Sequence, residues 1–144
     1  MKPDAVVIVA TIRSLKYNGG VALDDVKKEN LAALEKGAAN LEKHIENIKK
    51  FGVPAVVAVN VFPDDTASEI ELVKNICEKL GAEMAVSRVW AEGGRGGKEL
   101  AVAVLKSFKK KSKFRPIYDT KKSIKEKINI IAKVIYGARE VKFS

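Results

Sequence analysis

Three short segments of the chain combine polar and aromatic residues, and each directly follows a short apolar run that predicts a buried strand. If these strands are parallel neighbours, the segments emerge at the same edge of the sheet, where ligands bind in open α/β folds. That edge would carry an arginine, an asparagine, two acids and two large aromatic rings, which predicts a pocket for a flat, polar ligand. The segments are Thr11–Arg13, Asn60–Asp65 and Ser87–Trp90.

The elements that must position these segments alternate between strand and helix. Apolar runs predict strands at 5–10, 54–59 and 83–87, and apolar stripes at helical spacing predict helices at 31–48, 66–81, 98–110 and 121–136. This order predicts right-handed crossovers and an α/β three-layer sandwich with a mainly parallel sheet, in a single domain over 1–144. Two later segments could add an edge strand, and the early first strand suggests missing upstream neighbours. The later segments are 114–118 and 140–143.

Three details of the helices are specific expectations. Thr66–Glu69 has the form of a capping box, so a helix should start there. In the helix over 98–110, four apolar residues are expected to face inward, and in the helix over 121–136 a stripe of isoleucines should share one side. These residues are Leu100, Val104, Leu105 and Phe108 in the first helix, and Ile124, Ile128, Ile131 and Ile135 in the second.

The composition narrows the classes of partner. The chain has 144 residues, 47% of them hydrophobic, which is enough for a proper core. Its net charge of +9 invites a nucleic-acid function. However, the lysines alternate with acids on the predicted helix exteriors, and the one dense basic run, Lys106–Arg115, is typical of a solvated helix end and its connection. A nucleic-acid partner is therefore disfavoured, and attraction of anionic small molecules is favoured.

The sequence also bears on the compartment. No apolar stretch is long enough to span a membrane, and the N-terminus runs into a strand without a leader segment. Cys77 falls on the apolar face of a predicted helix, which predicts an inert core thiol. We therefore expect a cytoplasmic protein with no membrane partner.

The residues Val9–Gly20 closely resemble a signature of formate–tetrahydrofolate ligase (10-formyltetrahydrofolate synthetase), in which alanine usually stands where Ser14 does. Further similar blocks follow in the same order, so the resemblance covers nearly the whole chain. These blocks are Asn40–Asn47, Phe51–Pro54, Asn60–Thr66, Val89–Trp90 and Ser123–Ile128.

This resemblance implies a reaction and its substrates. Enzymes of the family join formate to the N10 atom of tetrahydrofolate at the expense of ATP, through formyl phosphate. The complete enzyme would take ATP-Mg, formate and tetrahydrofolate as substrates, with no tightly bound cofactor and no protein metal site.

Phe62 and Trp90 resemble the pair of rings that sandwich the folate in the family. Offset stacking gives a flat heterocycle about 0.5–1.5 kcal/mol per ring beyond area burial. We expect the two rings to face each other across a gap of about 7 Å, the separation that a sandwiched heterocycle requires at ordinary stacking distances. The alternative for Phe62, which precedes Pro63, is that it plugs its own loop.

Arg13 is the candidate catalytic residue, because a planar guanidinium makes paired hydrogen bonds to formyl phosphate or a substrate carboxylate. The alternative is a salt bridge that orders its loop. Asn60, Asp65 and Lys16 are candidate substrate contacts, although Asp65 could instead cap the helix that begins at Thr66. Four glycines are expected to form turns that allow close approach of backbone. They are Gly19, Gly20, Gly93 and Gly94.

The chain also departs from the family pattern. Family enzymes are much longer and carry, upstream of this region, a P-loop that grips the ATP phosphates. The nearest approach here, Gly93–Lys98, has Glu92 in place of the first glycine and is followed by Glu99 instead of a hydroxyl residue. Val61 stands where arginine is common, and Arg88 stands where an acid is usual.

Two functions remain open from the sequence. In the first, the chain is a part or subunit of formate–tetrahydrofolate ligase, active in an oligomer with a P-loop-bearing partner chain. In the second, it is a non-catalytic, truncated relative that serves as a folate- or nucleotide-binding or assembly module. A neighbouring reading frame that encodes the missing P-loop would favour the first.

Overall fold

The computed structural model describes residues 2–143 and contains a sheet of three parallel strands in the order β1-β2-β3. In this sheet Val57 of β2 lies opposite Ile8 of β1 and Met84 of β3, so β2 is paired on both sides. The predicted strands are confirmed, each to within one residue at either end. They are β1 (Val6–Ala10), β2 (Ala55–Asn60) and β3 (Glu83–Ser87).

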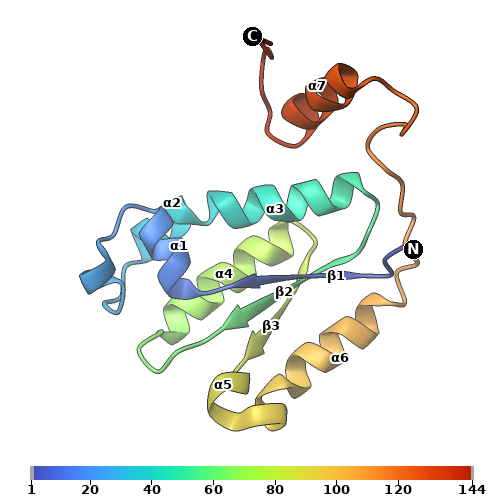
Figure 1. The fold of residues 1–144 in the computed structure, drawn as a ribbon. Coiled ribbons are helices and arrows are strands. Elements are labelled where there is room, and N and C mark those ends of the chain that lie inside the picture. The colour runs from blue at the N-terminus through green and yellow to red at the C-terminus, as the bar shows by residue number, and fades with distance from the viewer. Residues whose placement is uncertain (1, 144) are drawn as a thin grey trace.

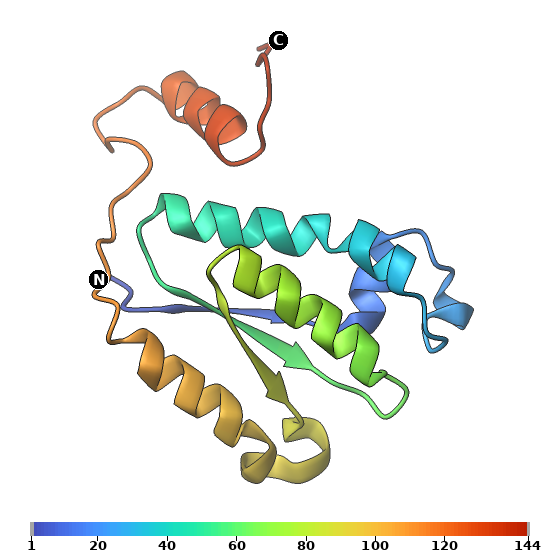
Figure 2. The same cartoon turned by 180° about the vertical axis from the view of Figure 1, so that it is seen from behind.

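Helices cover both faces of the sheet, which confirms the predicted three-layer α/β sandwich (Figures 1 and 2). α3 and α4 cover one face, where Val57 and Val59 join the main core, and α6 covers Val56 and Ala85 on the other face. The helices are α1 (Ile12–Asn18), α2 (Leu31–Gly37), α3 (Ala39–Lys50), α4 (Ala67–Lys79), α5 (Val89–Glu92), α6 (Lys98–Ser107) and α7 (Ile124–Val134), with 3-10 turns at Leu23–Asp25 and Gly93–Gly97.

The start of α4 is set by a reciprocal pair of hydrogen bonds. The Thr66 hydroxyl accepts from the Glu69 N–H at 3.2 Å, and the Glu69 carboxylate accepts from the Thr66 N–H at 3.1 Å. The predicted capping box is confirmed, and it satisfies two backbone donors that the first turn of a helix leaves free.

The predicted helix over 31–48 is two helices, α2 and α3, which meet at Ala38. The break follows from the close packing of α2 on α1, where glycines stand at the contact. A Cβ atom on Gly37 would lie 1.8 Å from the Leu15 carbonyl oxygen, and one on Gly19 would lie 1.9 Å from that of Ala33. The prediction of one continuous helix over 31–48 is therefore wrong at Ala38, because the packing of α2 on α1 sets the direction of α2.

The face of the sheet that α6 covers is incomplete. α6 packs against β2 and β3 and leaves β1 open, so Val7 and Val9 are 40% and 63% exposed. Leu105 and Phe108 are exposed too, which makes their predicted inward orientation wrong. Ala103 and Ser107 face the sheet instead. The helix therefore touches two strands through a narrow stripe, and its apolar flank stays uncovered.

The chain after α6 leaves the sheet as an extended connection, as the basic run predicted (Figure 1). The Arg115 N–H donates to the Phe51 carbonyl at 3.0 Å, and the rings of Phe51 and Phe114 stack with centroids 6.3 Å apart. Within the described residues neither 114–118 nor 140–143 is a strand, so the suggested edge strand is wrong. The connection pairs with the turn before β2 instead of with the sheet.

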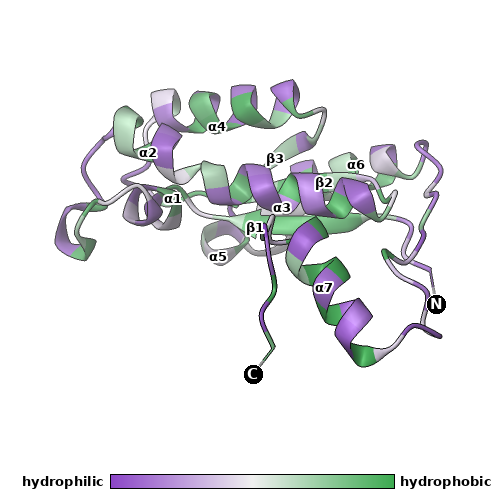
Figure 3. Cartoon of the chain, turned by 90° about the horizontal axis from the view of Figure 1, so that it is seen from above, coloured by the Kyte–Doolittle hydropathy of each residue, from purple (hydrophilic) through white to green (hydrophobic). Residues whose placement is uncertain are grey.

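α7 lies apart from the three layers, beyond α3 (Figures 1 and 2). Its N-cap is Ser123, which forms a second capping box with Glu126. Hydrophobic and hydrophilic residues alternate along its ribbon in Figure 3. Its predicted isoleucine stripe is only partly covered, because Ile124 is exposed and Ile131 is half-buried.

Two smaller expectations can be compared with the structure. Cys77 is fully buried in the main core, and burial raises the pKa of its thiol to about 11, which agrees with an inert thiol. Across residues 2–143, none of the helices combines the length and the apolar character needed to cross a bilayer.

The open face and free edge of β1 predict that the chain self-associates or needs a partner. We expect Val9→Lys to weaken self-association by about tenfold, since a lysine on an edge strand opposes further pairing and keeps its charge in water. Sedimentation velocity over a wide concentration range measures this. Ala32→Lys, which adds the same charge at an exposed position of α2, is the control. A monodisperse monomer throughout the range, or equal behaviour of the two variants, would contradict the prediction.

Candidate functional site

The carboxyl ends of the three strands bring the polar and aromatic segments to one edge of the sheet (Figure 1). β1 leads into α1, which carries Arg13, β2 leads into the turn with Phe62, and β3 leads into α5, which carries Trp90. The loops that carry the two rings follow adjacent strands, as expected. The sequence therefore placed these three side chains correctly relative to the sheet.

Arg13, Phe62 and Trp90 form a continuous stack. The guanidinium carbon of Arg13 lies 4.1 Å from the centroid of the Phe62 ring, and the rings of Phe62 and Trp90 have centroids 5.6 Å apart with planes at 26°. The expected gap of about 7 Å for a sandwiched heterocycle is therefore wrong for this structure, since the two rings pack against each other.

The backbone of Val61 explains why the rings meet. Its N–H donates to the Ser87 carbonyl at 3.1 Å, and its carbonyl accepts from Trp90 Nε1 at 2.9 Å. The indole is thus drawn to the end of β2, next to Phe62, although Trp90 as a whole is 57% exposed. The Val61 side chain is buried and packs in the main core, so only its backbone takes part in the site.

Arg13 makes the loop-ordering salt bridge that the sequence left as an alternative. Its Nη2 atom lies 2.7 Å from Oδ2 of Asp64, and the side chains of Arg13 and Asp64 are 28% and 43% exposed. The Arg13 Nε atom is buried without a hydrogen-bond partner within residues 2–143. The guanidinium therefore has an unused donor in addition to its contacts with Asp64 and Phe62. Asp64 is one of the two acids expected at this edge, but the sequence pattern predicted no partner for it.

Asp65 closes the turn that carries Phe62. Its Oδ2 atom accepts from the Phe62 N–H at 2.8 Å, while its Oδ1 atom is buried without a partner in the described part of the chain. Burial raises the pKa of this carboxyl, although the hydrogen bond from Phe62 lowers it. Thr66, and not Asp65, caps α4, so the predicted cap role of Asp65 is wrong. The Oδ1 atom is therefore a buried acceptor that none of the described residues uses.

Lys16 lies beneath the site in a buried ion pair. Its Nζ atom is 2.7 Å from Glu69 Oε1 and donates to the Lys28 carbonyl at 2.9 Å, and the side chains of Lys16 and Glu69 are fully buried. Glu69 Oε1 also accepts from the Asn30 N–H at 3.1 Å. Burial alone would raise the pKa of Glu69, but the hydrogen bonds from Lys16, Thr66 and Asn30 lower it below its usual value. The pair joins α1 to the start of α4.

Lys16 is a predicted substrate contact, but its amine has protein partners and no exposure. Glu69 is predicted only as the acid of the capping box, with no contact to Lys16. A buried lysine requires a buried acid, and only the packing of α1 against α4 shows which acid it is.

The remaining candidates line the edge or shape its turns. Asn60 ends β2, is half-buried and lies opposite Ser87 of β3. Gly20 and Gly93 adopt positive φ angles of 103° and 58°, and a Cβ atom on either residue or on Gly94 would meet open space. Gly19 instead serves the contact between α1 and α2.

One further glycine, Gly96, lies beside the site and has no role predicted from the sequence. A Cβ atom on Gly96 would lie 2.5 Å from the backbone of Arg88, and the Arg88 N–H donates to the Gly96 carbonyl at 3.0 Å. The glycine-rich turn therefore folds back onto the end of β3. The Arg88 side chain is exposed.

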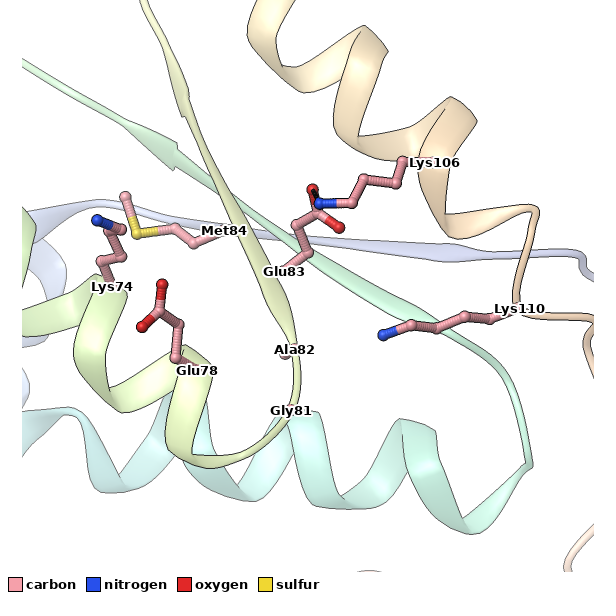
Figure 4. Close-up of a pocket in the computed structure, with 8 residues that line it drawn as sticks. All are labelled: Lys74, Glu78, Gly81, Ala82, Glu83, Met84, Lys106 and Lys110. Atoms are coloured by element: carbon pink, nitrogen blue, oxygen red, sulfur yellow. Dashed lines mark hydrogen bonds and ion pairs between the residues drawn. The ribbon is translucent and has the colours of Figure 1, made fainter.

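A shallow pocket at the opposite end of β3 is separate from this edge (Figure 4). It lies between the ends of α4 and α6, and Lys106 pairs there with Glu83 at 3.0 Å. None of the candidate catalytic, substrate-binding or turn residues predicted from the sequence lines it. Within residues 2–143, no group of three His, Cys, Asp or Glu side chains is arranged to hold a metal ion.

A family model described as formate–tetrahydrofolate ligase matches residues 1–144. The match includes all three strands and the segments that follow them. Arg13, Phe62 and Trp90 thus lie within one continuous match, in the same order as in the resemblance noted from the sequence.

The buried pair of Lys16 and Glu69 predicts a large and specific effect on stability. Lys16→Met should cost about 3–5 kcal/mol, because it leaves an uncompensated buried carboxylate. The double variant Lys16→Met, Glu69→Gln should recover much of this loss, since the amide oxygen still accepts from Asn30. Urea unfolding measures both. Lys74→Met, which breaks the exposed pair with Glu71, is the control and should cost under about 1 kcal/mol.

The same pair predicts an acid limb of stability. Because the folded-state pKa of Glu69 is below its usual value of 4.5, its contribution is complete above about pH 4.5 and is lost as the pH falls through the lower folded-state pKa. Equal losses for Lys16→Met and Lys74→Met, or an unchanged acid limb in the double variant, would contradict this assignment.

Proposed function

The chain belongs to the formate–tetrahydrofolate ligase family, and from this we propose that it supplies the folate-stacking side of the active site of such a ligase. The complete reaction joins formate to N10 of tetrahydrofolate with ATP, through formyl phosphate. The observation that carries the proposal is the stack of Arg13, Phe62 and Trp90 at the carboxyl edge of the sheet.

In this proposal Phe62 and Trp90 part to admit the flat pterin ring between them. The movement is small, from a centroid distance of 5.6 Å to the separation of about 7 Å that an inserted ring requires. Trp90 is the more exposed ring and sits in a short helix beside the glycine turn at Gly93, so it is the ring that moves. Phe62 stays in its turn, which Asp65 closes.

Polar groups around the rings would orient the ligand. Asp65 has one buried oxygen without a partner, which can accept a hydrogen bond from an N–H group at the edge of the pterin. Asn60 lies at the end of β2 and can donate and accept at the same edge. We assign Lys16 a positioning role in place of a substrate contact, because its amine is engaged with Glu69 and Lys28.

Arg13 would hold the phosphate end of formyl phosphate while N10 attacks the formyl carbon and phosphate leaves. A guanidinium matches two phosphate oxygens, and its fixed charge stabilises the negative charge that builds up on the leaving group. The buried Nε atom of Arg13, which has no partner in the described residues, is one donor for this purpose.

The sequence contains no P-loop motif, so ATP would be bound by a partner chain that carries one. The chain would then act as a single α/β domain in a cytoplasmic oligomer, and it would be inactive alone. The alternative is a non-catalytic relative that binds folate or a nucleotide, or that supports an assembly. A P-loop segment encoded next to this gene would support the ligase part.

The first expected outcome is that the purified chain releases no phosphate from ATP above background. Loss of the phosphate cradle removes most of the electrostatic stabilisation that phosphoryl transfer needs. The assay measures inorganic phosphate in the presence of formate and MgATP. Release above the level of a heat-denatured control, at a rate that scales with the protein concentration, would contradict it.

The second expected outcome is that tetrahydrofolate quenches the fluorescence of Trp90, the only tryptophan of the chain. Phe62→Ala should weaken binding by about tenfold, because one stacking face is lost. Phe108→Ala, which removes an exposed ring on α6, is the control and should bind as the parent chain does. Unchanged emission at millimolar tetrahydrofolate would refute the assignment of the site while leaving the fold and the family intact.

A further inference from the structure

Arg13 holds two parts of the Phe62 turn at once. Its guanidinium pairs with Asp64 at 2.7 Å and lies 4.1 Å from the centroid of the Phe62 ring. The same Phe62 ring stacks on Trp90. The residue proposed to hold an anion is therefore occupied by the turn whose ring is proposed to hold the flat ligand.

We propose that Asp64 and Arg13 form a latch that couples anion binding to the opening of the slot between Phe62 and Trp90. In the closed state Arg13 is bound to Asp64 and rests on Phe62. In the open state a phosphate-type dianion replaces Asp64 as the partner of the Arg13 guanidinium, and the rings of Phe62 and Trp90 separate. This inference rests on the proposed function, and Asp64 is a positioning residue that acts through Arg13.

The contacts make this exchange feasible. Asp64 is 43% exposed, and its one hydrogen bond within residues 2–143 is the one from Arg13. An exposed pair of this kind is weak, whereas a dianion can accept two parallel hydrogen bonds from the planar guanidinium. The buried Nε of Arg13 has no partner in the described chain and offers a further donor. A phosphate or acyl phosphate is therefore a stronger partner for Arg13 than Asp64 is.

Release of Arg13 from Asp64 would affect Phe62 directly, because Asp64 and Phe62 belong to one closed turn. The Asp65 N–H donates to the Phe62 carbonyl at 3.0 Å, and Asp65 Oδ2 accepts from the Phe62 N–H at 2.8 Å. When Arg13 leaves Asp64, this turn loses its tie to α1 and the ring loses the cation above it. Separation of the Phe62 ring from the Trp90 ring then costs less free energy.

Coupling of this kind is reciprocal. If an anion favours the open state, a flat ligand that requires the open state must raise the affinity for the anion by the same factor. The order of addition then does not matter, but each substrate promotes binding of the other. The chain would hold the acyl phosphate and the folate together and would bind either one alone less tightly.

The experiment uses inorganic phosphate as the anion and tetrahydrofolate as the flat ligand, at constant ionic strength. The emission of Trp90 reports the closed stack, and titrations of tetrahydrofolate with and without phosphate give the coupling factor. We expect phosphate alone to change the emission and to lower the Kd for tetrahydrofolate by about fivefold. Repeating the titration with acetyl phosphate distinguishes an acyl phosphate from free phosphate as the preferred anion.

Asp64→Asn isolates the latch. It should shift the emission without phosphate toward the phosphate-bound value, tighten tetrahydrofolate binding and reduce the coupling to below about twofold. Asp24→Asn removes an equal charge from the exposed turn before α2 and should keep the parent coupling. Thermal unfolding of both variants verifies that they are folded. A merely structural role of Asp64 would lower the unfolding temperature and leave the coupling unchanged.

The outcomes separate this inference from the proposed function. If tetrahydrofolate binds and phosphate leaves its Kd unchanged, the latch is overturned and the folate site stands. If tetrahydrofolate does not bind, but phosphate changes the emission of Trp90 in the parent chain and not in Asp64→Asn, the latch is supported and the folate site fails. Phosphate that leaves the emission of Trp90 unchanged in the parent chain overturns the latch.

Discussion

The buried ion pair between Lys16 and Glu69 is the interaction on which the arrangement of the site depends. Lys16 belongs to the helix that follows β1, and Glu69 belongs to the first turn of the helix that follows β2. Through Asn30 and Lys28 the pair also holds the segment that leads into α2. Two charges removed from water are tolerated only if each is fully satisfied, so the geometry around the pair has little freedom. Arg13 lies on α1, and Phe62 lies in the turn that leads into α4.

The three-stranded sheet positions these elements, but one of its faces is only partly covered by helices. α3 and α4 cover one face, whereas α6 covers only β2 and β3 on the other. The open face of β1 and the uncovered flank of α6 are apolar, and both lie outside the main core. A parallel sheet is normally buried on both faces, so this surface has the character of an interface. The incomplete layer is the observation that supports the proposed assembly with a partner chain.

The stack at the edge shows how one set of contacts can serve two purposes. Phe62 and Trp90 lie against each other and against Arg13, so the groups best suited to a flat ligand and an anion satisfy one another. Each contact is individually weak, with a cation–π pair worth about 0.5–1 kcal/mol and an aromatic pair about 0.5–1.5 kcal/mol. Contacts of this size keep the edge ordered and remain easy to exchange for a ligand. Val61 also helps to order this edge, since its carbonyl accepts a hydrogen bond from the Trp90 indole while its side chain packs in the core.

The sequence by itself determined the strands, the capping box at Thr66 and the convergence of Arg13, Phe62 and Trp90 at one edge. These follow from local patterns, because apolar runs, caps and the parallel order of strands act over a few residues or through topology alone. Its signature also pointed to the family that the match over the whole chain shows.

Only the tertiary structure decided which groups touch: that Lys16 pairs with Glu69, that the helix over 31–48 breaks at Ala38, that the flank of α6 stays exposed, and that the two rings close on each other. These outcomes depend on distances of a few ångströms between segments far apart in sequence. Such distances are set jointly by the packing of all the layers, and no local pattern encodes them.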